Sequence, residues 1–368
     1  MSNKTYKPEW QPENAGKEYA SFVMPGVEIN PTVKKTYKAK KVKLTVDEYV
    51  KGVLEQNITI FSKTITLIES NSEEHIKIGQ EVLKKILPYT GKSVRIGITG
   101  SPGAGKSTFI EAFGTYLCKQ GLKIAVLAID PSSTITKGSI LGDKTRMEML
   151  SREPNAFIRP SPSGGALGGV TRKTRETILL CEAAEYDVIL IETVGVGQSE
   201  VTVRSMVDFF MLLLIPGSGD ELQGIKKGVV ELADLLIVNK ADGTNVEKAK
   251  VTCHQYSMAL NMLQPATQGW KTHAVTASAL TGKGIPEIWT EINRFVDTTK
   301  RLGVFDQRRR QQTLEWVYTI IEEELRKRFF NNPDISAVLP EIEKNVLSGE
   351  LTPTNAVNQL LNIFFKKQ

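Results

Sequence analysis

A chain of 368 residues with 40% hydrophobic and 24% charged side chains has the composition of a globular protein with a large buried core. It contains no run of about 18 apolar residues, which excludes an inserted membrane segment. The net charge of +6 is concentrated in "KKTYKAKKVK" (34–43), and no nucleic-acid motif accompanies it. We therefore expect neither a membrane nor a nucleic-acid partner.

The first 45 residues form an irregular basic arm, rich in proline, lysine and asparagine and without hydrophobic periodicity. Three glutamates among the first 20 residues are atypical of a secretory signal or a transit peptide. The three cysteines, Cys118, Cys181 and Cys253, lie far apart and are typical of a reducing compartment. Together these features predict a cytoplasmic protein.

Residues 46–90 are predicted to form a helical hairpin. Apolar residues recur at steps of three and four from Leu54 to Ile68, which indicates one amphipathic helix, and residues 73–87 indicate a second.

Residues 91–300 alternate apolar strand-like runs with helical segments, as in a mostly parallel sheet covered by helices on both faces. The expected strands are 93–100, 123–130, 187–195, 208–217, 234–240 and 272–278. Ligands of such α/β sheets bind at the carboxyl ends of the strands, where polar and glycine residues follow each run.

Residues 301–368 are predicted to be a helical extension. Leu314, Val317, Ile321 and Leu325 form one stripe, and two shorter helices follow, the last with Thr352 as its cap and Pro353 in its first position. The stripe fits two arrangements, a cover for the chain's own domain or a dimer contact.

"GSPGAGKS" (100–107) matches the phosphate-loop pattern G-x-x-x-x-G-K-[ST] between a strand and a helix. Its glycines allow backbone N–H groups to surround anionic oxygens, Lys106 reaches the β- and γ-phosphates, and Ser107 is a Mg²⁺ ligand. The predicted phosphate-binding residues are Gly100, Pro102, Gly103, Ala104, Gly105, Lys106, Ser107 and Thr108.

"VNKAD" places Asn239, Lys240 and Asp242 in the N-K-x-D arrangement. A carboxylate there accepts two hydrogen bonds from guanine, whereas adenine has no matching pair of donors. "TASAL" ends the next strand and adds the backbone of Ser278, Ala279 and Leu280 for the guanine carbonyl. These signals predict GTP and GDP as the nucleotides.

Carboxylates follow two further strands. Asp130, Asp143 and Glu192 are candidate Mg²⁺ ligands with Ser107, and Gly195 is a candidate donor to the γ-phosphate. Asp130 also fits a turn residue before Pro131, and Glu192 fits either a metal ligand or a general base.

Seven motifs in this order resemble the MeaB-type GTPases, chaperones of adenosylcobalamin-dependent methylmalonyl-CoA mutase: "GSPGAGKST", "AIDPSS", "LGDKTRM", "RPSPSGGALGG", "IETVGVGQSE", "GDELQGIKKG" and "VNKADG". The resemblance spans about residues 50–330. It implies a GTPase that gates adenosylcobalamin loading and protects or reactivates its mutase, and a homodimer joined through the helical extension.

The resemblance also implies site roles. Ser107, Asp130, Asp143 and Glu192 hold Mg²⁺, and the loop with Asp220, Gln223 and Lys226 is a switch that communicates with the mutase. The predicted catalytic residues are therefore Lys106, Asp130, Asp143, Glu192 and Lys226.

Two alternatives stay open at this point. A P-loop small-molecule kinase or transport-associated ATPase shares the phosphate loop but usually selects adenine. A nickel-delivery GTPase normally carries a His or Cys cluster for its cargo, whereas His75, His254 and His273 are scattered along this chain.

Overall fold

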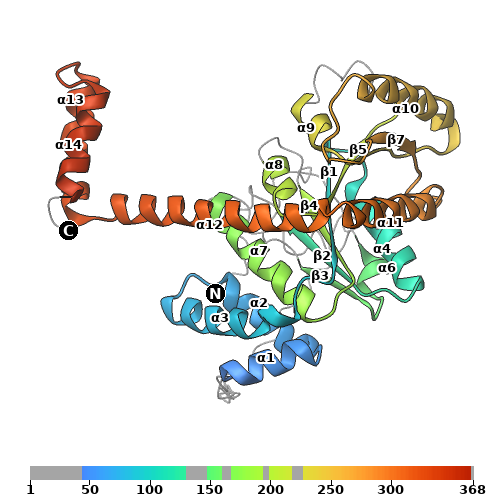
Figure 1. Ribbon diagram of the computed structural model, residues 1–368, viewed down its shortest axis with the longest axis horizontal. Coiled ribbons are helices and arrows are strands. Elements are labelled where there is room, and N and C mark those ends of the chain that lie inside the picture. The colour runs from blue at the N-terminus through green and yellow to red at the C-terminus, as the bar shows by residue number, and fades with distance from the viewer. Residues whose placement is uncertain (1–43, 130–146, 160–166, 194–198, 218–226, 366–368) are drawn as a thin grey trace, which may run out of the picture. The chain divides into compact units, whose positions relative to one another are not determined.

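The computed structural model describes residues 44–129, 147–159, 167–193, 199–217 and 227–365, and the chain divides into the units Met1–Leu44 and Thr45–Gln368. The second unit contains a seven-stranded sheet in the order β3-β2-β4-β1-β5-β6-β7, and every described pairing in it is parallel (Figure 1). The strands are β1 Val94–Gly100, β2 Ile124–Ile129, β3 Ala156–Arg159, β4 Val188–Thr193, β5 Phe209–Leu214, β6 Leu235–Val238 and β7 His273–Thr276.

The expected α/β fold and all six expected strands are confirmed, and the structure adds β3. This strand has four residues and pairs with β2 alone, at the edge of the sheet. Its apolar residues are followed by the charged Arg159, and the sequence analysis did not predict this strand.

Helices cover both faces of the sheet. Ile96 and Ile98 point to the face covered by α4 (Lys106–Lys119) and α11 (Ile285–Arg301). The other face is covered by α7 (Leu167–Ala183), α8 (Ser199–Arg204), α9 (Lys227–Leu232) and α10 (Val246–Leu260). Successive strand residues point to opposite faces, and both faces are buried, which explains the continuous apolar runs in the sequence.

The helical region before the sheet differs from the prediction in one respect. The single helix expected from Leu54 to Ile68 is two helices, α1 (Val46–Leu54) and α2 (Ile58–Glu69). Gln56 has a positive φ of 58° between them, and Asn57 then begins α2 by accepting from the N–H groups of Thr59 and Ile60. Hydrophobic periodicity continues across this break because both helices pack on the same core; α3 (Glu73–Ile86) follows as expected.

The carboxyl-terminal region is helical, as predicted: α12 (Val304–Phe330), α13 (Pro333–Leu347) and α14 (Pro353–Phe365). The last two helices pack against each other through Ile335, Ile342, Ala356 and Leu360. The Thr352 hydroxyl accepts from the N–H of Asn355 at 3.4 Å, in agreement with its expected capping role. None of the described helices is both long enough and apolar enough to span a bilayer.

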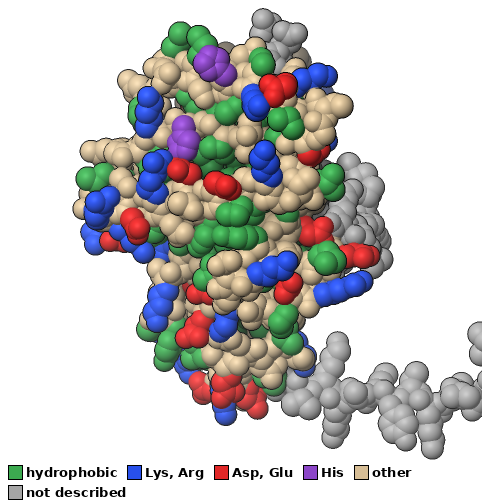
Figure 2. All heavy atoms as spheres, turned by 90° about the vertical axis from the view of Figure 1, so that its right-hand side faces the viewer, with side chains coloured by type: hydrophobic (Ala, Val, Ile, Leu, Met, Phe, Trp, Pro, Cys, Tyr) green, Lys and Arg blue, Asp and Glu red, His purple; other side chains and the backbone are tan. Residues whose placement is uncertain are grey.

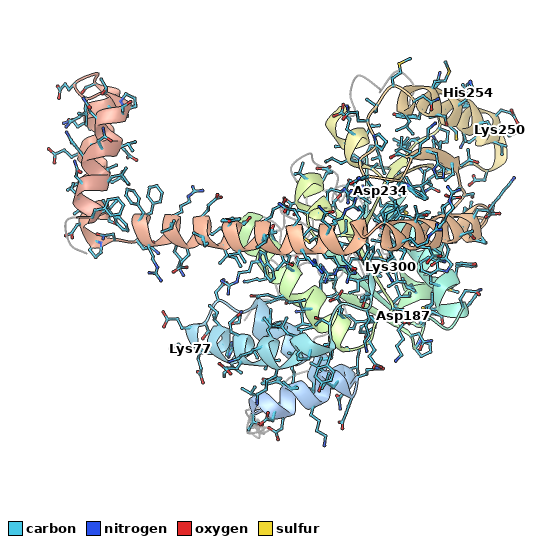
Figure 3. The ribbon with its side chains drawn as sticks, in the orientation of Figure 1. Lys77, Asp187, Asp234, Lys250, His254 and Lys300 are labelled. Carbon is cyan, nitrogen blue, oxygen red and sulfur yellow. The ribbon has the colours of Figure 1, made fainter. Side chains whose placement is uncertain are left out.

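Buried ion pairs attach the start of α12 to the amino-terminal edge of the sheet. Arg309 contacts Asp208, the residue before β5, with 2.8 Å between Nε and Oδ1 and 2.6 Å between Nη2 and Oδ2. The second oxygen also accepts from the N–H of Arg95 in β1. Asp187 and Asp234, labelled in Figure 3, precede β4 and β6 and likewise accept from backbone N–H groups of a neighbouring strand or loop.

We expect Asp208→Asn to lower the free energy of unfolding by about 3 kcal/mol, because it removes the carboxylate that binds the buried Arg309 charge through two hydrogen bonds and leaves the more distant Glu182, at 3.7 Å, as its counter-ion. The matched control is Asp47→Asn, which removes the Lys85–Asp47 pair. Both pairs have an N–O distance of 2.6 Å, but the side chain of Asp208 is 1% exposed and that of Asp47 82%.

The control should change stability by less than about 0.5 kcal/mol, since solvent screens an exposed pair. Urea unfolding monitored by circular dichroism measures both. Equal losses in the two variants would contradict the anchoring role of Asp208.

Candidate functional site

The phosphate loop connects β1 to α4, as its motif predicts. Gly103 and Gly105 have φ values of 82° and 83°, a left-handed conformation that glycine adopts without strain. The Lys106 ammonium donates to the carbonyl of Gly100 at 2.8 Å and to that of Ser101 at 3.3 Å. Lys106 therefore lies along the loop, next to the amino terminus of α4, where anionic oxygens bind favourably.

The surroundings of Lys106 contain a carboxylate that the sequence analysis missed. Burial lowers the pKa of Lys106 below its usual value, and the negative charges of Glu192 and Glu200 act in the opposite direction. Glu200 lies in the first turn of α8 and is buried. A charged residue in "GQSE" (197–200), close after the candidate γ-phosphate contact Gly195, was the available signal for Glu200.

Ser107 and Glu192 meet at the expected metal position. Ser107 is in the first turn of α4, Glu192 is in β4, and the hydroxyl donates to the carboxylate Oε1 at 3.2 Å. A hydroxyl and a carboxylate oxygen are the hard ligands that Mg²⁺ prefers, so the two side chains fit a magnesium site. Four predicted site residues, Asp130, Asp143, Gly195 and Lys226, lie outside the described residues, as do Asp220 and Gln223.

The predicted base-binding residues lie next to the phosphate loop. Asn239 follows β6 and is 1% exposed. Its Nδ2 donates to the Ala104 carbonyl at 2.9 Å, and its Oδ1 accepts from the N–H of Ala279 at 3.1 Å. One amide thus connects the phosphate loop with both predicted base segments.

Asp242 is held by a second contact, because the Ser278 hydroxyl donates to Asp242 Oδ2 and accepts from the N–H of Thr281. Lys240 is exposed and has a positive φ of 57°, a strained conformation of the kind found at binding sites.

Two of the backbone donors expected for guanine already have acceptors. The N–H of Ser278 donates to the carbonyl of Lys283, and that of Ala279 donates to Asn239 Oδ1. A guanine carbonyl would therefore share the Ala279 donor with Asn239.

The His and Cys residues that a nickel-delivery GTPase would need are scattered over the structure. His75, His254 and His273 belong to α3, α10 and β7, and the described residues contain no group of three His, Cys, Asp or Glu side chains suited to a metal ion. Burial raises the pKa of Cys118 to about 11 and also raises the pKa values of Cys181 and Cys253, so these thiols are poor metal ligands. Acidic and basic side chains are interspersed on the face that Figure 2 shows.

Comparison with known proteins gives consistent matches. The family model described as methylmalonyl Co-A mutase-associated GTPase MeaB matches residues 61–334. The GTPase ArgK of Escherichia coli is 46% identical over 316 residues, which are 86% of this chain and 96% of the relative. A mitochondrial methylmalonic aciduria type A homolog of Mus musculus is 44% identical over 329 residues, covering 87% of this chain and 79% of the relative.

A solved structure agrees with the fold. The crystal structure of an LAO/AO transport system kinase matches with a TM-score of 0.71 and 39% sequence identity, over 87% of this chain and 97% of that chain.

The site geometry predicts different effects for two glycine substitutions in the phosphate loop. A Cβ at Gly105 would lie 2.9 Å from Asn239 Nδ2, whereas a Cβ at Gly103 would meet no atom within 4 Å. Both variants, Gly105→Ala and Gly103→Ala, pay about 1 kcal/mol for the positive φ. Gly105→Ala should lose about a further 1–2 kcal/mol, because it displaces the amide from the Ala104 carbonyl.

Thermal unfolding without nucleotide measures this difference, since a Cβ at either position would also disturb bound phosphates. Equal stabilities of the two variants would show that the Asn239 contact does not hold the loop.

Proposed function

The chain belongs to the MeaB family of GTPases and hydrolyses GTP to GDP and phosphate, and we propose that this hydrolysis gates adenosylcobalamin loading onto a methylmalonyl-CoA mutase or a related acyl-CoA mutase. The same proposal includes protection or reactivation of that mutase, in the cytoplasm. The observation that supports it is a pair of connections: Asn239 joins the phosphate loop to the predicted base segments, and Arg175 joins α7 and the end of α8 to the helical extension.

In this proposal the phosphate loop binds the triphosphate and Lys106 moves from the carbonyls of Gly100 and Ser101 to the β- and γ-phosphates. Ser107 and Glu192 would hold Mg²⁺ together with Asp130 and Asp143, and Gly195 would contact the γ-phosphate. Bound Mg²⁺ supplies positive charge against the phosphate oxygens. Glu192 orients the metal or accepts a proton from the attacking water, since its carboxylate faces the start of α4.

Guanine recognition rests on Asp242, whose carboxylate is oriented by the Ser278 hydroxyl. Lys240 extends over the phosphate loop, since its Cε is 3.7 Å from a Cβ placed on Gly105. Leu280 is 80% exposed next to these residues, and we assign its backbone to the rim of the base pocket.

Arg175, in α7, connects that helix and the end of α8 with α12. Its Nη2 donates to the carbonyl and hydroxyl of Ser205, just after α8, and its Nη1 donates to the carbonyl of Gln312 in α12. Burial lowers the pKa of Arg175 to about 10. A displacement of α8 would therefore be transmitted to α12.

Three polar atoms at this junction are buried without a hydrogen-bond partner among the described residues: Arg175 Nε, Gln312 Oε1 and Trp316 Nε1. Each costs about 1–3 kcal/mol when left unpaired. Two donors and an acceptor in one place are consistent with a second position of α12 in which they pair, as a nucleotide-driven movement requires.

The helical extension is also the proposed dimer contact. Leu314, Val317, Ile321 and Leu325 are all exposed on α12 in the single chain. A second copy that covered this stripe would form the homodimer that the family resemblance implies.

Asp242→Asn should weaken GTP binding by at least about 100-fold and admit xanthosine triphosphate, because the exchange converts an acceptor into a donor. Ser278→Ala is the matched variant: it loses the hydroxyl that orients Asp242, so GTP should weaken by about tenfold with no gain of the xanthine nucleotide. Titration with fluorescent nucleotides measures both. Unchanged GTP selectivity in Asp242→Asn would reject the base assignment.

The chaperone proposal predicts faster GTP turnover when a purified acyl-CoA mutase is added, with different rates for its apo and cofactor-loaded forms. Lys226→Ala should bind nucleotide normally and respond less to the mutase. Arg175→Met should keep basal hydrolysis within about threefold and lose the response, since it breaks the connection to α12.

Phosphate release under steady-state conditions measures these rates. No effect of any candidate mutase would reject the chaperone role while leaving the GTPase activity intact. Phosphorylation of a small-molecule acceptor with ATP would favour the kinase alternative instead.

A further inference from the structure

We propose that Thr193 and Thr99 form a positioning pair that sets the place of the Glu192 carboxylate in the hydrolysis site. The two side chains lie in adjacent strands, 0% and 1% exposed, and the Thr193 hydroxyl donates to Thr99 Oγ1 at 2.8 Å. The inference rests on the proposed role of Glu192 and names the contact that holds this residue in place.

The pair lies where the backbone pairing of the two strands ends. The register of β1 and β4 runs as far as Ile98 opposite Glu192. The next residues of β1, Thr99 and Gly100, pair with β5 on the other side. The bond between the two hydroxyls therefore continues the connection of β1 and β4 by one residue, into the segment that carries the site.

Glu192 and Thr193 point to opposite faces of the sheet, because successive strand residues alternate. Glu192 points toward α4 and reaches Ser107, whereas Thr193 lies on the face covered by α8. A contact that fixes Thr193 on one face limits rotation of the strand end, and so limits movement of the carboxylate on the other face. The branched Cβ of threonine adds to this restraint by restricting χ1.

The pair also joins the two halves of the site. Thr99 is followed by Gly100, whose carbonyl accepts from Lys106, and Thr193 follows Glu192. The hydroxyl bond thus fixes the anchor of the catalytic lysine relative to the metal-binding carboxylate.

Stability alone does not explain two hydroxyls at this position. On the same face of β1, a Cβ on Gly97, two residues before Thr99, would lie within 3.1 Å of the apolar side chains of Phe210, Val203 and Val207. Replacing both partners of a buried hydrogen bond with apolar groups of the same shape is nearly neutral for stability. A pair of valines would fill the same space and keep the pairing of Thr193 with Ile129 of β2, but it would lack a directional bond between the end of β4 and β1.

The test compares Thr193→Val, the double variant Thr99→Val/Thr193→Val, and Thr193→Ser, which keeps the hydroxyl. The control is Thr299→Val in α11, which removes an equally buried hydroxyl that donates to the carbonyl of Phe295. Each protein is measured for GTP turnover, for thermal unfolding, and for the Mg²⁺ concentration that half-saturates the fluorescence change of bound N-methylanthraniloyl-GDP.

We expect kcat to fall by about tenfold in Thr193→Val and in the double variant, with KM for GTP changed by less than about twofold. The half-saturating Mg²⁺ concentration should rise by about fivefold in the same two proteins, a shift that does not depend on turnover. Thr193→Ser and Thr299→Val should stay within about twofold of the wild type in all three quantities.

Wild-type kcat and Mg²⁺ dependence in the folded double variant would overturn the inference, as would a defect in Thr193→Ser as large as that in Thr193→Val. Glu192→Gln separates this result from the proposed function. Full turnover in Glu192→Gln would reject the role of Glu192 itself. Loss of turnover there, with a fully active double variant, would reject the positioning pair alone.

Discussion

The buried amide of Asn239 holds the phosphate loop and the base segments in one arrangement, and the candidate site depends on it. The strand β5 lies between β1 and β6 in the sheet. The loops that follow β1 and β6 are therefore not brought together by backbone pairing of these two strands. Asn239 spans this separation by donating to Ala104 and accepting from Ala279. Gly105 is required next to it, because a Cβ there would lie 2.9 Å from the amide nitrogen. A single nucleotide can then contact both groups of residues.

The carboxyl ends and the amino ends of the strands have different roles. At the carboxyl ends of the strands lie residues of the candidate site: Lys106 at the start of α4, Glu192 in β4 and Asn239 after β6. At the amino edge, the residues before β5 and β6, Asp208 and Asp234, anchor α12 through buried ion pairs with Arg309 and Arg308. The helices α7 and α8 lie on the same face of the sheet (Figure 1), and hydrogen bonds of Arg175 join them to α12. This arrangement offers a mechanical route from the nucleotide to the helical extension.

Much of the fold was predictable because parallel strands buried on both faces are continuous apolar runs, and six of the seven strands were predicted in this way. The exceptions have local causes. The strand β3 lies at the edge of the sheet and ends in the charged Arg159, and a break at Gln56 separates two helices that pack on one core. The sequence also did not single out Glu200, because its proximity to Lys106 comes from the packing of α8 on β1 and β4.

The sequence by itself determined the chemistry of this protein: a phosphate loop, an N-K-x-D segment and a strand-end glutamate are local patterns whose residue types carry their function. The tertiary structure decided which of these residues meet. The contacts of Asn239 with Ala104, Ser107 with Glu192, and Thr193 with Thr99 join residues that are 135, 85 and 94 positions apart. These contacts follow from the strand order and from the direction of the side chains in the folded sheet, and the local sequence contains neither.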